Sequence, residues 1–131
     1  MSNDRIRSAM VLYAIEQGLA KFVTHMGSRG ESIPDGIRRQ VTAREGQGAE
    51  PLNDEEIVSA TYLDELIASA AAMSTDRTEA NVVRQLREKA RMLDLFSVRN
   101  AIAHPNRPFP KVYWYRIAAL AADPVFEQLN I

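Results

Sequence analysis

One short stretch of this chain, residues 97–107, brings together side chains that can carry out acid–base chemistry on a phosphate group. Arg99 stands five positions before His104, and Asn100 directly follows the arginine. Histidine titrates near neutral pH and can act as a general base or acid. Arginine stays charged, and its planar fork matches two phosphate oxygens. The three residue types predict a site that acts on a phosphodiester or another anion.

The region around this stretch carries a local positive charge, although the whole chain has a formal net charge of only -1. Residues 95–122 contain no acidic residue. The same interval holds five basic residues interleaved with a group of aromatic residues, namely Arg99, His104, Arg107, Lys111 and Arg116 with Phe109, Tyr113, Trp114 and Tyr115. We predict that Arg107, Lys111 and Arg116 contact phosphates. Consecutive helical residues point in different directions, so at most two of the aromatic residues at 113–115 can stack on bases, and the others favour the core.

Composition places the chain among ordinary globular proteins and excludes several kinds of chemistry. At 131 residues, positions 1–131 are expected to form a single domain. Cysteine is absent, which removes thiolate metal ligands and cysteine nucleophiles. His25 and His104 are the only histidines, neither has a carboxylate at a metal-ligand spacing, and no phosphate-binding glycine loop occurs. We therefore expect chemistry without a metal or cofactor.

The sequence predicts a cytoplasmic protein that does not enter the membrane. No apolar run reaches the roughly 20 residues that span a bilayer, and residues 1–5 lack the features of a signal peptide. Ile131 directly follows the last expected helix, which is compatible with one domain of a larger protein.

Apolar periodicity and capping signals predict an all-α fold, an antiparallel bundle of four to five helices. Apolar residues in 5–26 recur at steps of three and four, and His25 is expected to be an exposed residue of the last turn. Residues 27–52 are rich in glycine and read as a loop-rich insertion, in which Pro34 can begin a short helix through Arg44 and residues 45–50 are mobile. Further helices are expected at 53–73, with an Asn53–Glu56 capping box, and at 76–96, with an apolar core stripe that runs to Phe96. Whether the second of these continues through Arg99 is left open. Two more helices are expected at 110–122 and after Asp123.

Regular helix geometry constrains the three candidate residues. Five positions at 100° each place Arg99 and His104 about 140° apart, whereas Asn100 and His104 differ by about 40°. Two arrangements would bring the arginine and the histidine together. His104 precedes Pro105 and is therefore biased away from helical geometry, so its side chain can swing out. Alternatively, the arginine of one subunit meets the histidine of another, in a dimer with two-fold symmetry.

The spacing from Arg99 to His104, with polar Asn100 after the arginine and the longer stretch 98–105, resembles the signature of the HEPN superfamily. This resemblance implies a helical bundle and a homodimeric, metal-independent endoribonuclease in which two such motifs face each other across the interface. It also implies a toxin or phage-defence role, controlled by an antitoxin or a regulatory domain. Arg99, Asn100 and His104 would be catalytic, and the products of single-stranded RNA cleavage would carry a 2′,3′-cyclic phosphate.

Other interpretations of the same residues remain open at this point. The domain can be a non-catalytic HEPN module that dimerises or binds RNA, a nucleotide or a partner protein. It can also be a plain helical interaction domain in which the motif is coincidental. Arg99 would then pair with Asp94 or a neighbouring helix, His104 would cap a helix, and Asn100 would be an ordinary surface or interhelical residue.

Overall fold

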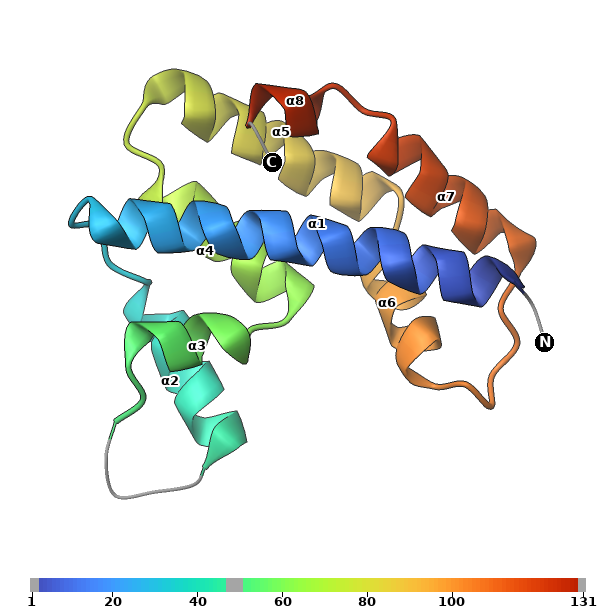
Figure 1. Cartoon of the computed structure of the whole chain (residues 1–131), viewed down its shortest axis with the longest axis horizontal. Helices are drawn as coiled ribbons and strands as arrows, with labels where there is room; N and C mark the ends of the chain where they lie inside the picture. The colour runs from blue at the N-terminus through green and yellow to red at the C-terminus, as the bar shows by residue number, and fades with distance from the viewer. Residues whose placement is uncertain (1–2, 47–50, 130–131) are drawn as a thin grey trace.

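The computed structural model describes residues 3–46 and 51–129, and every regular element in that part of the chain is a helix. The helices are α1 (Asn3–Ser28), α2 (Asp35–Glu45), α3 (Asp54–Ser59), α4 (Leu63–Met73), α5 (Arg77–Met92), α6 (Leu95–Ala103), α7 (Lys111–Ala121) and α8 (Val125–Gln128). The long helix α1 packs against α3, α4, α6 and α7, while α5 packs against α4, α6 and α8 (Figure 1). The all-α prediction is confirmed.

The predicted apolar stripe of α1 forms the centre of the core. Its buried members are Leu12, Ile15, Leu19, Phe22, Val23 and Met26. The helix ends at Ser28, after which Gly30 adopts a left-handed φ of 93° and the Glu31 N–H donates to the Met26 carbonyl at 3.1 Å. A glycine takes this conformation without steric cost. His25 is exposed in the last turn, as predicted.

The helix predicted at 53–73 is two helices, α3 and α4. The Asn53 capping box is confirmed, because the Asn53 side chain accepts from the Glu56 N–H at 2.8 Å and Glu56 accepts from the Asn53 N–H at 3.0 Å. The chain then breaks at residues 60–62. The Tyr62 N–H donates to Glu65 Oε1 at 2.8 Å, which starts α4 in a new direction. No glycine or proline marks this break, so periodicity alone missed it.

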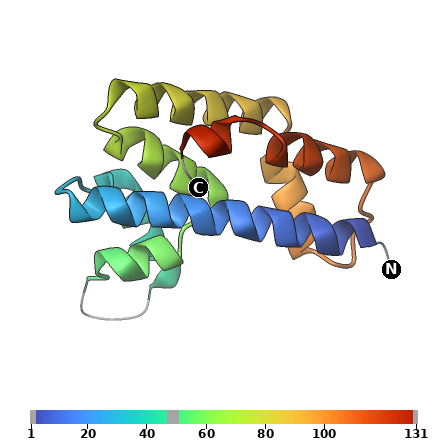
Figure 2. The same cartoon turned by 45° about the horizontal axis from the view of Figure 1, so that its top comes forward.

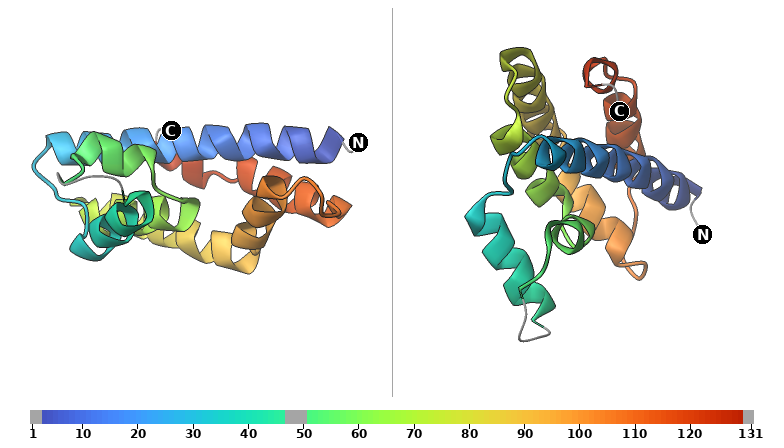
Figure 3. Two further views of the ribbon diagram at one scale, coloured as in Figure 1. Left: turned by 90° about the horizontal axis from the view of Figure 1, so that it is seen from below. Right: turned by 60° about the vertical axis from the view of Figure 1, so that its left-hand side comes forward.

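The helix predicted at 76–96 is also divided, into α5 and α6. Asp94 adopts a left-handed backbone with a φ of 51°, a conformation that aspartate tolerates better than most residues. The chain turns there, and α6 leaves the line of α5 (Figure 3). The turn also removes Phe96 from the predicted core stripe, and 40% of this residue is exposed. The described ranges hold eight helices rather than the expected four to five, and two of the additional helices arise from these breaks.

The loop-rich insertion contains the short helix that Pro34 predicted, now α2. Gly46 ends it with a left-handed φ of 52° and donates its N–H to the Thr42 carbonyl at 2.8 Å. Of the stretch 45–50 that was expected to be mobile, positions 47–50 lie outside the described residues.

The C-terminal capping signal is confirmed. Asp123 accepts from the Val125 N–H at 3.0 Å and from Lys89 Nζ at 2.6 Å. These bonds start α8 and connect it to α5, against which it packs (Figure 2).

None of the helices in the described ranges is long and apolar enough to cross a membrane.

A buried ion pair joins α2 to the start of α4. Arg44 donates to both carboxylate oxygens of Glu65, at 2.6 and 3.0 Å, and also to the Ala60 carbonyl at 2.8 Å. Its guanidinium lies 3.8 Å from the Tyr62 ring centroid. Burial acts to raise the pKa of Glu65, but the hydrogen bonds from Arg44 and the Tyr62 N–H outweigh burial and lower this pKa below its usual value. We call these four residues the Arg44 cluster.

Candidate functional site

Helix α6 carries the predicted catalytic residues and ends immediately before His104. The His104 backbone has a φ of -119° and a ψ of 83°, outside the helical region, as expected for a residue that precedes a proline. Its N–H still donates to the Ala101 carbonyl at 3.3 Å, so the residue caps the helix while its side chain is exposed. His104 therefore leaves the helical path within one chain, which is the first of the two arrangements expected from helix geometry.

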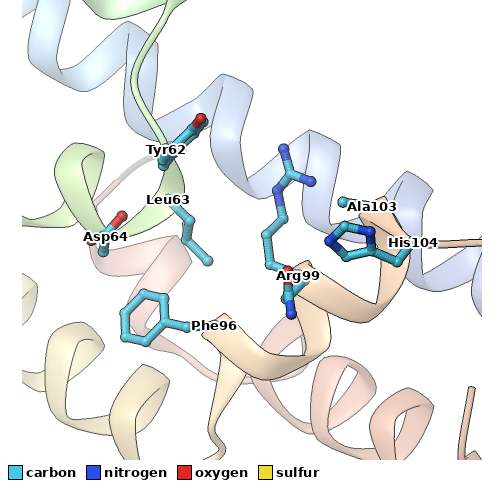
Figure 4. Close-up of a pocket in the computed structure, with 8 residues that line it drawn as sticks. Tyr62, Leu63, Asp64, Phe96, Arg99, Ala103 and His104 are labelled. Carbon is cyan, nitrogen blue, oxygen red and sulfur yellow. The ribbon is translucent and has the colours of Figure 1, made fainter. Parts of the chain in front are cut away.

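Arg99, Asn100 and His104 line a single open pocket of about 460 Å³. The opposite wall consists of Tyr62, Leu63 and Asp64 at the start of α4 and Phe96 in the first turn of α6, with Ala103 between Phe96 and His104 in the chain (Figure 4). The pocket lies where α6 faces the break between α3 and α4. The two helix breaks that sequence analysis missed thus create the far wall.

An ion pair with α1 holds Arg99. Its Nε donates to Glu16 Oε1 at 2.8 Å, and the two side chains are 39% and 18% exposed. Among the described residues, neither Nη1 nor Nη2 of Arg99 has a hydrogen-bond partner. The side chain is therefore oriented by a carboxylate on one edge, while its terminal fork is available to two oxygens of a ligand.

A second contact from α1 fixes the segment that follows His104. Arg5 donates through Nη1 to the Pro105 carbonyl at 3.1 Å and through Nη2 to the Arg107 carbonyl. Its guanidinium also lies 5.4 Å from the Phe109 ring centroid. One helix consequently positions both the arginine and the segment after the histidine. Sequence reasoning missed Arg5 and Glu16, since each lies 83 or more residues from its partner and no local pattern connects them.

The predicted phosphate contacts do not line this pocket. Arg107 is exposed in the segment after His104, and Lys111 is exposed at the start of α7. Arg116 is half-buried with its guanidinium 5.5 Å from the Tyr113 ring centroid. The structure brings together Arg99, Asn100 and His104, but it leaves these three basic residues outside.

The aromatic residues of α7 mostly serve packing. Tyr113 and Trp114 are half-buried against the core, and Arg7 lies 4.2 Å from the Trp114 ring centroid. Only Tyr115 is largely exposed, at 57%. This agrees with the expectation that at most two of the three rings are available to bases.

The structural alternatives for the motif residues hold in part. Arg99 does pair with a neighbouring helix, through Glu16 rather than Asp94, and His104 does cap α6. Neither contact uses the Arg99 fork or the imidazole ring. Within residues 3–46 and 51–129, no cluster of three or more potential ligands could hold a metal ion.

Comparisons with protein-family models, with curated proteins and with solved structures found no match to this chain.

Proposed function

We propose that this chain is a HEPN-like endoribonuclease domain that cleaves single-stranded RNA without a metal ion. The observation that carries the proposal is the pocket in which Arg99, Asn100 and His104 meet, with the imidazole exposed and the terminal fork of the arginine unpaired. A toxin or phage-defence role, under control of an antitoxin or a regulatory domain, belongs to the same proposal.

These side chains provide the base and the positive donors that the reaction needs. The 2′-OH of the substrate attacks the adjacent phosphorus after His104 accepts its proton, and the bond from phosphorus to the 5′-oxygen breaks. The leaving oxygen receives a proton from water or from a second imidazole. The products are a 2′,3′-cyclic phosphate and a 5′-OH.

Arg99 and Asn100 act on the phosphate and on the histidine. Negative charge develops on the phosphoryl oxygens in the transition state, and the Arg99 fork can bind two of them. Glu16 holds this fork in place and, through its charge, restricts free movement of the guanidinium. Asn100 stands one helical turn before His104, from where it can orient the imidazole or donate to the phosphate. Arg107 follows the histidine by three positions, and with Lys111 and Arg116 it remains our proposed contact to flanking phosphates.

A homodimer is part of the proposal. Ile6, Met10 and Tyr13 share one face of α1 and are 50%, 68% and 64% exposed. Tyr13 also lines a small cavity together with Glu16, Arg99 and Ile102. A second copy that covered this apolar face would bring two Arg99–Glu16 pairs close to the symmetry axis. Met10→Glu should convert the dimer to a monomer, which sedimentation equilibrium would measure; a wild-type chain that is monomeric at all concentrations would contradict this part.

The experiment that tests the function is cleavage of a labelled, unstructured RNA in excess chelator. His104→Ala should lower the rate by about 10²–10⁴-fold, the usual contribution of a general acid–base group. His25→Ala is the matched control, because His25 is also exposed at the end of a helix but lies outside the pocket. Equal rates for the two variants would contradict the assignment of His104.

The non-catalytic alternative has one observation in its favour. Glu16 is paired with Arg99 and Asp64 lines the opposite wall of the same pocket, and both carboxylates weaken the attraction for a phosphate. Binding of RNA without any chelator-resistant cleavage by the wild type would favour a binding module over an enzyme.

A further inference from the structure

The wall that faces Arg99 carries two exposed aromatic rings and a carboxylate. Tyr62 is 54% and Phe96 is 40% exposed, and both line the pocket together with Asp64. In Figure 4 these three side chains lie on one side of the pocket, and Arg99 and His104 lie on the other. Exposed rings beside an anion-binding group are the usual combination in sites for single-stranded nucleic acids.

Tyr62 is fixed before any ligand arrives. Its backbone N–H donates to Glu65, and the Arg44 guanidinium stacks on its ring at 3.8 Å. Arg44 is held in turn by both oxygens of Glu65. The Arg44 cluster therefore holds the ring at the mouth of the pocket, which lowers the entropy lost when a ligand packs against it.

Phe96 is exposed because of the turn at Asp94. The apolar periodicity of the chain predicts this residue in the core, yet the left-handed turn moves it into the pocket wall. Its neighbours in α6, Leu95 and Val98, are buried and anchor the helix. The fold therefore presents an aromatic ring to solvent on a helix that is otherwise well packed.

Asp64 supplies an acceptor on the same side of the pocket as the two rings. The residue is exposed, and among the described residues its carboxylate has no hydrogen bond or ion pair. It also lines a second cavity of about 220 Å³, together with Phe96, Arg87 and Arg91. Asp64 and Phe96 line both cavities, so a strand bound at Arg99 that continued past these two residues would approach two further cations.

We propose that Tyr62, Phe96 and Asp64 form a nucleobase subsite that selects a base with an exocyclic amino group over uracil. The proposal rests on the proposed function, since it places this base next to the phosphate at Arg99 and His104. A ring stacks on Phe96 and packs against Tyr62, and its amino group donates to the Asp64 carboxylate. Aspartate accepts from the N4 amino group of cytosine, whereas uracil turns a carbonyl oxygen toward the same carboxylate and is repelled. A pocket of about 460 Å³ falls within the size range of small-ligand sites, about 300–1,000 Å³.

Cytosine and uracil provide the sharpest comparison, because they have the same size and differ at this edge. Fluorescence anisotropy of labelled oligocytidine and oligouridine pentamers, measured with the His104→Ala chain so that the RNA stays intact, gives the preference directly. We expect oligocytidine to bind roughly tenfold more tightly, the effect of one hydrogen bond to a charged group. Asp64→Asn should bring this ratio close to one, since an amide can accept from cytosine and donate to uracil.

Phe96→Ala should weaken both pentamers by about tenfold without changing their ratio, because stacking does not depend on the identity of the base. Asp35→Asn in the first turn of α2 is the matched control and should bind like the parent. A cytosine preference that survives Asp64→Asn, or Phe96→Ala binding equal to the parent, would overturn the subsite, as would no binding at all.

The subsite and the ribonuclease can fail separately. Wild-type chain that binds with the predicted preference but does not cleave would remove the catalytic function and leave the subsite standing. Cleavage that depends on His104, with a base preference that does not depend on Asp64, would remove the subsite and leave the catalytic function standing.

Discussion

Two arginine–glutamate pairs connect distant helices in this protein, and they differ in how fully the arginine is used. In the Arg44 cluster, the guanidinium binds two carboxylate oxygens and a carbonyl and stacks on a ring, and the Glu65 side chain is only 7% exposed. In the second pair, Arg99 makes one bond to Glu16 through Nε and is 39% exposed. The first guanidinium donates three hydrogen bonds through its two terminal nitrogens and leaves only its buried Nε without a partner, whereas the second donates through Nε alone and has both terminal nitrogens unpaired among the described residues.

The burial of the pair and the number of guanidinium hydrogen bonds distinguish a structural ion pair from one that can bind a ligand. The presence of an arginine–glutamate pair alone does not. A largely buried pair with several hydrogen bonds mainly prevents the fold from rearranging, because removing either partner leaves a buried group without a hydrogen-bond partner. A half-satisfied pair at an open pocket orients a cation and leaves capacity to bind. The comparison therefore predicts opposite phenotypes for substitutions in the two pairs.

Arg44→Ala should give the largest change in stability. Glu65 would remain buried beside Ala60 without its cation, and the free energy of unfolding should fall by about 3 kcal/mol, the lower range for breaking a buried pair. The expected fall in Tm is roughly 10 °C, measured by circular dichroism. Arg38→Ala, which removes the more exposed pair with Asp54, is the control and should change the free energy of unfolding by less than about 1 kcal/mol. Similar losses in both variants would break the comparison.

Glu16→Ala should lower RNA cleavage by about tenfold with little change in Tm, because Arg99 loses the hydrogen bond that orients it. Glu16→Gln keeps an oxygen that can accept from Arg99 Nε and should stay within about threefold of the wild-type rate. A large loss of rate with alanine and a small loss with glutamine would indicate that Glu16 positions Arg99. If Glu16→Ala cleaved RNA as fast as wild type, the ion pair would have no part in the reaction.

Acid should weaken the Arg44 cluster through Glu65. Its folded-state pKa is depressed, so the carboxylate contributes stability above the unfolded value, about 4.3, and this contribution is lost as pH falls through the folded pKa. The difference in free energy of unfolding between wild type and Glu65→Gln should therefore be constant from pH 7 to about pH 5 and shrink below pH 4. Urea unfolding at several pH values measures it. If the difference in free energy of unfolding grew toward low pH, the pKa of Glu65 would not be lowered in the folded state.

Sequence patterns predicted the parts of this protein that depend on near neighbours. The stripe of α1, the Asn53 capping box, the proline-started α2 and the Asp123 cap all follow from residues within a few positions. The departure of His104 from the helix likewise follows from Pro105.

The turns that build the far wall of the pocket could not be predicted in this way. Asp94 turns the chain without glycine, and the break before Tyr62 depends on Glu65 and on Arg44, which comes from another helix. The partners of the motif were also out of reach of local patterns. Glu16 lies 83 residues before Arg99, so only the packing of α1 against α6 reveals the pair.

We propose that Arg99 is a functional cation and not a structural one, and the substitution Arg99→Ala distinguishes these two roles. The rate of cleavage of single-stranded RNA in chelator should fall by about 10²–10³-fold, the cost of removing one transition-state donor, while the Tm stays within about 2 °C of wild type. Arg84→Ala, exposed on α5, is the matched control and should change neither quantity. An Arg99→Ala chain that cleaves RNA at the wild-type rate, or that loses activity only by unfolding, would contradict the account.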